Sequence, residues 1–308
     1  MANNQDIITV LVPVYNSPDI KATINSILIQ TYRYIQLIIL DDGSDNFDTG
    51  SIEKYIKQNA KNVVESIVLH NAQNIGTVKN LNQGLSLSKG KIIIFLAGDD
   101  AFFDEKVIED WVQEFNRTNS NIITAKRMLC DELMQSSGEV APTKEQIKWI
   151  EELSPRELYE KLCQFNFIFG CCTAIRKDFI AGIGGFDEKY RLIEDYPFVL
   201  KASRRKNEIT FFDRLVVKYR DGGASSAKHY SRGYKADSDK IFMREILPYV
   251  KHKYRAFCDY RKWRRGQDRN KYEYLDKNNK FYLVLYKVSF AIKYPEAISE
   301  YIRHKMRR

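Results

Sequence analysis

Residues 91–104 read KIIIFLAGDDAFFD, an apolar run followed by two adjacent carboxylates, Asp99 and Asp100. The run 92–97 has the length and β-branched content of a strand covered on both faces, and a glycine then lets the chain turn. Parallel α/β sheets bind ligands at the carboxyl ends of their strands, so this acidic pair, beside an exposed Phe102–Phe103, lies where a site is expected. The alternative is a strand-to-helix turn whose aspartates cap the next helix.

Strands and helices alternate with short loops on the amino-terminal side of this stretch. A hydroxyl before a proline at Ser17–Pro18 indicates the start of the first helix. The alternation predicts an α/β fold with a Rossmann-like, mostly parallel central sheet flanked by helices. The strands are expected over 7–14, 35–40 and 63–69, and the helices over 17–30, 51–59 and 77–87.

The pattern beyond residue 104 is less regular. Residues 128–150 have no clear period and are interpreted as a polar insertion that could bind a partner or a second substrate. Helices are expected from 104 to about 116, from Ser154–Pro155 to 164, and over 177–181 and 197–205. Strands are expected over 121–126, 167–175, 209–212 and 215–219.

Composition narrows the class of protein. The chain has 308 residues, of which 44% are hydrophobic, which supports a substantial core. No run approaches the ~20 apolar residues of a membrane span, and residues 1–6 are too polar for a signal peptide, so a cytoplasmic location is expected. The five cysteines are odd in number and lack paired CxxC spacing, which indicates neither disulfides nor zinc; we expect buried thiols, with Cys171 and Cys172 adjacent on a strand.

The net charge of +9 is concentrated at the carboxyl-terminal end. Residues 251–308 carry 17 Lys and Arg against 6 Asp and Glu, a net of +11, while residues 1–250 carry 32 against 34, a net of −2. This asymmetry indicates an anionic partner surface. The apolar segment 281–292 is too short to span a bilayer but suits its interface, so peripheral association with a membrane is favoured. Plain packing of an amphipathic helix is the alternative; nucleic acid is disfavoured because no recognised motif occurs.

Three acidic clusters stand at predicted turns: Asp41–Asp42, Asp99–Asp100 and Glu194–Asp195. Carboxylates at the ends of strands in one sheet can converge although they are far apart in sequence. A hard divalent cation such as Mg²⁺ or Mn²⁺ binds one or two carboxylates and completes its shell with water and substrate phosphates. A further carboxylate could act as a general base, a combination that suits group transfer from a nucleoside diphosphate.

Seven sequence segments together carry a family resemblance. They are VPVYN (12–16), SILIQTY (26–32), LDDGSD (40–45), NIGTVKNLNQGL (74–85), GKIIIFLAGDD (90–100), GGFDE (184–188) and ED (194–195). In the order and spacing of these segments, over residues 6–225, the chain resembles the inverting glycosyltransferases of family 2, which have the GT-A fold and in bacteria often build surface polysaccharides. The resemblance implies a GT-A domain at 1–227, and the charge and apolar pattern beyond it predict a helical, basic extension at 228–308.

The resemblance implies a donor site for a UDP-sugar. Pro13 and Tyr15 lie where the family places the donor's base, Asp42 where a carboxylate accepts from the uracil ring, and Lys79 where a basic residue is often found near the nucleotide. The family's metal motif is usually Asp-x-Asp. Here its first position is Ala97, so the cation and the donor diphosphate are assigned to Asp99, helped by Asp100.

The resemblance also implies an acceptor side. Asp195 corresponds to the general base, and Glu194 and Asp187 lie where contacts with the acceptor are expected. His229 could close over the metal and diphosphate, although a surface histidine without such a role is the simpler interpretation. The acceptor expected by analogy is a glycan or a lipid-linked oligosaccharide at the inner face of the cell membrane, as in O-antigen or capsule synthesis.

Two other functions compete with this hypothesis. A non-catalytic binding protein that keeps the nucleotide-sugar fold and is tethered by its basic tail is supported by the altered Ala97 position alone. A nucleotidyltransferase would need a glycine-rich, basic phosphate loop after the first strand, and VPVYNSPD lacks one.

Overall fold

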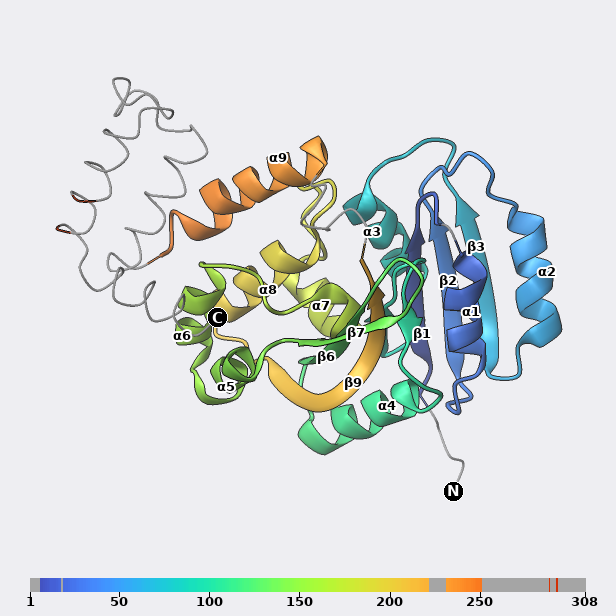
Figure 1. The fold of residues 1–308 in the computed structure, drawn as a ribbon, viewed down its shortest axis with the longest axis horizontal. Helices are drawn as coiled ribbons and strands as arrows, with labels where there is room; N and C mark the ends of the chain where they lie inside the picture. The colour runs from blue at the N-terminus through green and yellow to red at the C-terminus, as the bar shows by residue number, and fades with distance from the viewer. Residues whose placement is uncertain (1–5, 18, 222–230, 251–287, 289–291, 293–308) are drawn as a thin grey trace. The chain divides into compact units, whose positions relative to one another are not determined.

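A computed structural model describes residues 6–17, 19–221, 231–250, 288 and 292 (Figure 1). The chain divides into two compact units, Met1–Lys240 and Ile241–Arg308. In the second unit the described part contains a π-helical turn, Phe242–Ile246. The predicted domain boundary at 227/228 lies outside the described residues, as do almost all of the basic tail, His229 and Cys258.

The amino-terminal half is a parallel β/α layer, as predicted. Its strands pair in the order β3-β2-β1-β4, and the segments that connect them carry α1, α2 and α3. Figure 1 shows β1, β2 and β3 side by side, with α2 at the outer edge. The bounds are β1 (Ile8–Val14), α1 (Ile20–Leu28), β2 (Ile35–Asp41), α2 (Thr49–Asn59), β3 (Val63–His70), α3 (Thr77–Leu87) and β4 (Ile92–Phe95).

The second half extends the same sheet with mixed pairing. β8 is antiparallel to β4, β6 is antiparallel to β8, and β9 runs parallel to β6. The whole sheet has nine strands in the described part of the chain. The remaining elements are β5 (Ala101–Phe102), α4 (Val107–Thr118), β6 (Ile122–Cys130), β7 (Ser136–Ala141), α5 (Lys144–Glu152), α6 (Pro155–Leu162), β8 (Thr173–Arg176), α7 (Lys177–Ile183), α8 (Asp195–Arg204), β9 (Thr210–Arg220) and α9 (Arg232–Ile241).

The apolar strand residues form the core of the parallel layer. Residues of β1 and β2 such as Val10, Leu37 and Ile39 are fully buried, and so is Ile27 of α1. Burial on both faces explains why these strands read as continuous apolar runs rather than as alternating patterns. At about 25 cal/mol per Å² of apolar surface, burial of such side chains is the main stabilising contribution to this half.

Two predicted helix starts have different outcomes. The Ser154–Pro155 start is confirmed, because Ser154 Oγ accepts from Glu157 N in a capping box. The start at Ser17 is wrong, because α1 begins at Ile20 and its N-cap is Asp19. The Ser17 hydroxyl instead donates to the carbonyl oxygen of Gly98, which ties the end of β1 to the turn after β4.

Residues 128–150, interpreted from the sequence as a polar insertion without clear period, contain regular elements, so the expected lack of secondary structure is wrong. They contain the end of β6, the strand β7 that pairs with it, and the helix α5. The sequence of β7, SSGEVA, is polar and its residues are mostly exposed, so no alternation of apolar residues marked it. A capping box between Thr143 and Gln146 begins α5, and this T-x-x-Q pattern is the signal that could have predicted the helix.

Three further predictions need correction. The two strands expected over 209–212 and 215–219 form one strand, β9 (Thr210–Arg220), because a shift in its pairing with β6 absorbs residues 212–214. Cys171 and Cys172 lie in a 3-10 turn, Gly170–Cys172, before β8 rather than on a strand; Cys172 is buried as expected, but Cys171 is only partly buried. Phe102 is 4% exposed, because it pairs with β9 within β5 instead of facing solvent.

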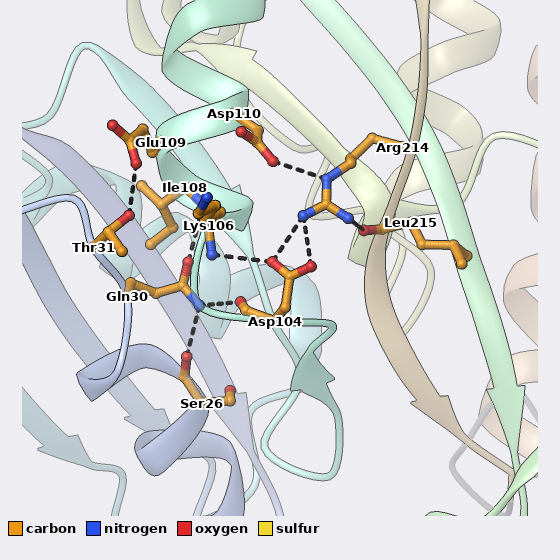
Figure 2. A network of polar contacts seen from close by, with 10 residues as sticks. All are labelled: Ser26, Gln30, Thr31, Asp104, Lys106, Ile108, Glu109, Asp110, Arg214 and Leu215. Carbon is orange, nitrogen blue, oxygen red and sulfur yellow. Dashed lines mark hydrogen bonds and ion pairs between the residues drawn. The ribbon is translucent and has the colours of Figure 1, made fainter.

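An arginine joins the start of α4 to β9 (Figure 2). The guanidinium of Arg214 donates to both carboxylate oxygens of Asp104, at 2.8 and 2.6 Å, and to Asp110 Oδ2 at 2.8 Å. On the other side, Gln30 Nε2 donates to the carbonyl oxygen of Asp104, and Ile108 N donates to Gln30 Oε1. These bonds fix Asp104, which follows the Asp99–Asp100 turn and β5, between the end of α1 and β9.

None of the helices among the described residues has both the length and the apolar character that crossing a bilayer requires.

Candidate functional site

The pairing of the strands brings the three acidic turns to one edge of the sheet. β1, β2 and β4 are parallel neighbours, so the turns that carry Asp42 and Asp100 follow strand ends on the same side. β8 is antiparallel to β4 and pairs Ala174 with Ile94, which puts the turn before β8 at that side too. Asp195 is bonded to this turn through Gly170 N. The three clusters therefore lie on one side of the sheet, beside the ends of its strands.

The Asp41–Asp42 turn after β2 is densely hydrogen-bonded. Asp41 is fully buried, and its carboxylate accepts from the amides of Gly43 and Ser44, from the Ser44 hydroxyl, and contacts His70 Nδ1 at 2.7 Å. Both carboxylate oxygens of Asp41 have hydrogen-bond partners, so Asp41 stabilises the turn.

Asp42 fixes the loop before α3. Its Oδ1 accepts from Ile75 N at 2.8 Å and its Oδ2 from Gly76 N at 2.9 Å, and the side chain is 4% exposed. Gly76, the N-cap of α3, has φ +96°, a conformation that glycine adopts without strain. Asp42 therefore positions this loop, and its assignment to the uracil ring stays a prediction.

The Asp99–Asp100 turn is built differently. Asp100 is 1% exposed; its Oδ1 accepts from Arg220 N at 2.9 Å, while Oδ2 is buried and has no hydrogen-bond partner among the described residues. Burial raises the pKa of Asp99, and burial together with nearby charges raises that of Asp100 well above its usual value. Neither caps the next helix, because the N-cap of α4 is Lys106. The helix-cap interpretation is wrong.

Arg220 was missed by the sequence reasoning. It ends β9, and its side chain donates from Nε to the carbonyl oxygen of Asp99 at 2.9 Å and from Nη1 to that of Glu132 at 2.7 Å. The guanidinium thus holds the backbone of the acidic turn without forming an ion pair with its carboxylates. Only the pairing of β9 with β5 and β6 brings it there.

Glu194 and Asp195 begin α8 beside an apolar cavity. The cavity, of about 20 Å³, is lined by both carboxylates and by rings such as Phe95 and Phe186, and it has room for about one water molecule. Gly170 allows the close approach, because a Cβ there would lie 3.1 Å from Glu194 Oε1 and 3.2 Å from Asp195 Cβ.

The two neighbours differ in their hydrogen bonds. Asp195 accepts from Gly170 N at 3.1 Å, from Asn166 Nδ2 at 3.2 Å and from Tyr196 N at 2.6 Å. Burial raises the pKa of both carboxyls, and the charge of Asp195 helps to raise that of Glu194 to about 8. The hydrogen-bond donors favour the charged form of Asp195, whereas burial and the charge of its neighbour favour the neutral form of Glu194.

Arg127 lies between the Asp99–Asp100 turn and the Glu194–Asp195 turn. Its guanidinium carbon is 3.7 Å from the centre of the Phe169 ring and 4.0 Å from that of Tyr219. Phe169 adjoins Gly170, which bonds Asp195, and Tyr219 adjoins Arg220, which bonds Asp100. The charge of Arg127 lowers the pKa of both aspartates against the larger effect of burial. No sequence motif pointed to this residue.

The other predicted residues lie around this edge. Tyr15 is 55% exposed after β1, and the carbonyl oxygen of Pro13 accepts from Gly98 N at 2.9 Å. Lys79 is exposed on α3 in a shallow groove that Glu188 also lines. Asp187 accepts from Lys189 N within its own turn. Their assigned roles stay predictions.

No group of three or more His, Cys, Asp or Glu side chains that could hold a metal occurs in the described ranges. A site for Mg²⁺ does not require such a group, because this ion commonly uses one or two carboxylates with water and substrate phosphates. Asp99 and Asp100, whose Oδ2 has no hydrogen-bond partner among the described residues, are the candidates for such a site.

Comparisons of sequence identify what the chain is similar to. The profile described as glycosyl transferase family 2 matches residues 9–184. An uncharacterized glycosyltransferase of Rickettsia prowazekii is 28% identical over 70% of this chain and 64% of its own length. EpsJ of Bacillus subtilis, also an uncharacterized glycosyltransferase, is 28% identical over 70% of this chain and 61% of its own length. This chain thus spans less than two thirds of the length of these relatives. The glycosyltransferase GlyG of Streptococcus pneumoniae is 26% identical over 78% of this chain and 80% of its own length.

Comparison of structures gives the same fold. S. aureus TarS 1–349 in complex with UDP-GlcNAc superposes with a TM-score of 0.61 at 18% identity, covering 85% of this chain and 74% of TarS 1–349. TarS 1–349 alone gives a TM-score of 0.60 at 17% identity, and the superposition covers 94% of this chain and 82% of TarS 1–349. At this identity the likeness concerns the fold, and it confirms the predicted GT-A architecture.

Proposed function

The chain belongs to glycosyl transferase family 2, and on that premise we propose that it transfers a sugar from a UDP-sugar to a hydroxyl of a glycan or lipid-linked acceptor. The observation that carries the proposal is the division of roles between Asp195 and Glu194. Asp195 accepts hydrogen bonds from three donors, which favour its charged form, whereas burial and the charge of Asp195 raise the pKa of Glu194 to about 8. A general base must be ionised at the working pH, and the three donors favour that form of Asp195.

Asp195 acts first on the acceptor. Its carboxylate removes the proton from the acceptor hydroxyl while the oxygen attacks the anomeric carbon of the donor sugar. The bond from that carbon to the UDP oxygen breaks, and UDP leaves with the bonding electron pair. One displacement from the face opposite the leaving group inverts the anomeric centre. Protonated Glu194 can donate a hydrogen bond to the acceptor without repelling the charge that develops there.

The donor side is supported by likeness and by position. The TarS structure with the same fold contains UDP-GlcNAc, which favours UDP as the carrier here. Tyr15 offers an exposed ring at the end of β1, and Asp42 fixes the adjoining loop by its bonds to residues 75 and 76. We assign the nucleotide base to the space beside Pro13, Tyr15 and Asp42, with Lys79 as the nearby cation.

Asp99 and Asp100 would hold the divalent cation, Mg²⁺ or Mn²⁺. The buried Oδ2 of Asp100 is an acceptor without a partner in the described part of the chain, which is unfavourable unless a cation or a water binds there. When bound, the cation supplies positive charge to the leaving diphosphate. Arg220 keeps the turn in shape by its bond to the carbonyl oxygen of Asp99.

A screen of UDP-sugars tests the proposal. Purified full-length protein is incubated with each UDP-sugar, candidate glycan acceptors and Mg²⁺ or Mn²⁺, and released UDP is measured. We expect UDP release with one or a few donors, its loss in EDTA, and its restoration by added cation. The Asp195→Asn variant should bind UDP normally and turn over far more slowly. UDP binding without turnover by the wild type under all conditions would favour the non-catalytic alternative.

We further propose that the basic tail associates with the inner face of the cell membrane, where a lipid-linked acceptor would lie. The motivating observation is the net charge of +11 in residues 251–308. Full-length protein should sediment with vesicles that contain phosphatidylglycerol, less so at high salt, and a variant truncated after Tyr249 should stay in the supernatant. Equal sedimentation of the two proteins would contradict the proposal.

A further inference from the structure

One carboxylate of α9 gathers three successive backbone amides. Asp237 is 1% exposed, and its Oδ2 accepts from Arg191 N at 2.7 Å, from Leu192 N at 2.6 Å and from Ile193 N at 3.3 Å. The next residues in the chain are Glu194 and Asp195. A bent segment that directs three amides at one oxygen needs a negative acceptor, because amides that point to a common place have no partner in a regular helix or strand.

A second contact joins α9 to the same segment. Lys240 Nζ lies 3.5 Å from Asp237 Oδ1 and donates to the carbonyl oxygen of Lys189 at 3.1 Å. Residues 189–193 therefore have both an amide side and a carbonyl side bonded to α9. The segment lies between α7 and α8 and has no regular secondary structure of its own, so these contacts limit its freedom.

Arg191 joins the other side of the segment to the loop before α3. Its guanidinium donates to the carbonyl and side-chain oxygens of Asn74, at 2.9 and 2.6 Å, and its own carbonyl oxygen accepts from Val78 N at 3.1 Å. Gly76 packs so closely that a Cβ there would lie 2.5 Å from Arg191 Cγ. This is the loop that Asp42 holds, so the segment before Asp195 is fixed between α9 and the assigned donor side.

We propose that Asp237 is a positioning residue that sets the place of the general base Asp195. The inference rests on the proposed function. Only one residue separates the last bonded amide, that of Ile193, from Asp195, so a shift of the segment moves the base with it. Loss of Asp237 leaves three amides without their acceptor, and a displacement of about 1 Å at a reacting group can lower a rate about 100-fold.

The test compares two variants of Asp237 with a matched control in full-length protein. Asp237→Ala removes the acceptor, and Asp237→Asn keeps one neutral oxygen for the amides. Asp48→Ala is the control, because Asp48 also accepts a backbone amide, that of Ser51 at 3.0 Å, but as the N-cap of α2. The measurements are kcat for UDP release, Kd for UDP, and the melting temperature.

We expect kcat of Asp237→Ala to fall by about 10- to 100-fold, with Kd for UDP changed by less than about threefold. Asp237→Asn should lose about three- to tenfold in kcat, because one neutral oxygen replaces the carboxylate. Asp48→Ala should lower the melting temperature and leave kcat unchanged. A purely structural role of Asp237 would make its variants resemble this control.

Several results would overturn the inference. They are a kcat of folded Asp237→Ala within twofold of the wild type, or a fall in UDP affinity as large as the fall in kcat. If Asp237→Ala does not fold, Asp237→Asn decides, and an unchanged kcat for that variant overturns the inference. Absence of turnover in the wild type with every UDP-sugar contradicts the proposed function instead, so the two failures are distinguishable.

Discussion

Two pairs of adjacent carboxylates on one side of the sheet differ in how strongly burial disfavours their charged forms. Asp41 and Asp42 each accept several hydrogen bonds, most of them from amides of their own or the neighbouring loop. Glu194 and Asp195 lie beside an apolar cavity with raised pKa values. The first pair stabilises the fold, whereas burial disfavours the charged forms of the second pair. Residues that cost stability in this way are expected where chemistry occurs.

The largest effect is expected from Asp195→Asn. The variant removes the base but keeps the shape of the side chain, so kcat should fall by about 10²- to 10⁴-fold while UDP binding is kept. A stopped assay for UDP and calorimetry with UDP measure the two quantities. Turnover above a tenth of the wild-type rate would show that Asp195 is not the general base. The Glu194–Asp195 pair would then have no catalytic role to set against the structural role of Asp41 and Asp42.

Stability should change in opposite directions in the two pairs. Asp42→Asn replaces a charged acceptor of two amides by a group with one acceptor, which should cost about 1–3 kcal/mol of unfolding free energy. The folded pKa of Asp195 is raised above its unfolded value, so its contribution to stability is lost as pH rises. Asp195→Asn should therefore be at least as stable as the wild type at pH 7. Urea unfolding without nucleotide measures the unfolding free energy of both variants. Equal losses of stability in Asp42→Asn and Asp195→Asn would contradict the difference between the two pairs.

Arg127→Met tests what keeps Asp195 ionised. Arg127 lowers the pKa of Asp195, so its removal should move the acid limb of the pH–rate profile upward by up to about one unit. Arg127→Lys keeps the charge and should leave the limb closer to its wild-type position. A uniform loss of rate at all pH values, with the limb unmoved, would assign Arg127 a packing role between its two rings.

The smallest effect on activity is expected from Glu194→Gln at pH 7. Glu194, with a pKa of about 8, is protonated there, and glutamine resembles that neutral form, so kcat should stay within about threefold of the wild type. Because the folded pKa lies above the unfolded value of 4.5, Glu194 stabilises fully below pH 4.5 and loses that contribution as pH rises through 8. Melting temperatures from pH 5 to 9 should fall less steeply for the variant than for the wild type.

The accuracy of the predictions from sequence differs between the parallel half of the sheet and its second, mixed half. In the parallel half, buried strands and amphipathic helices carry periodic apolar residues, and the predicted strands 35–40 and 63–69 and helix 77–87 agree with β2, β3 and α3 within one residue. In the second half, β7 is polar on both faces and β9 contains a break in its pairing. Their patterns come from long-range pairing, which leaves little local periodicity to detect.

The sequence by itself determined the β/α alternation, the family, and the three acidic turns as candidates, because periodic burial and turn residues act over a few neighbouring positions. Only the tertiary structure decided which carboxylates are satisfied and which are not. Arg220 reaches Asp100 across 120 positions and Asp237 reaches Arg191 across 46. Such partners leave no mark on local sequence, because a hydrogen bond depends on distance in space, and the pairing of β9 and the packing of α9 set that distance.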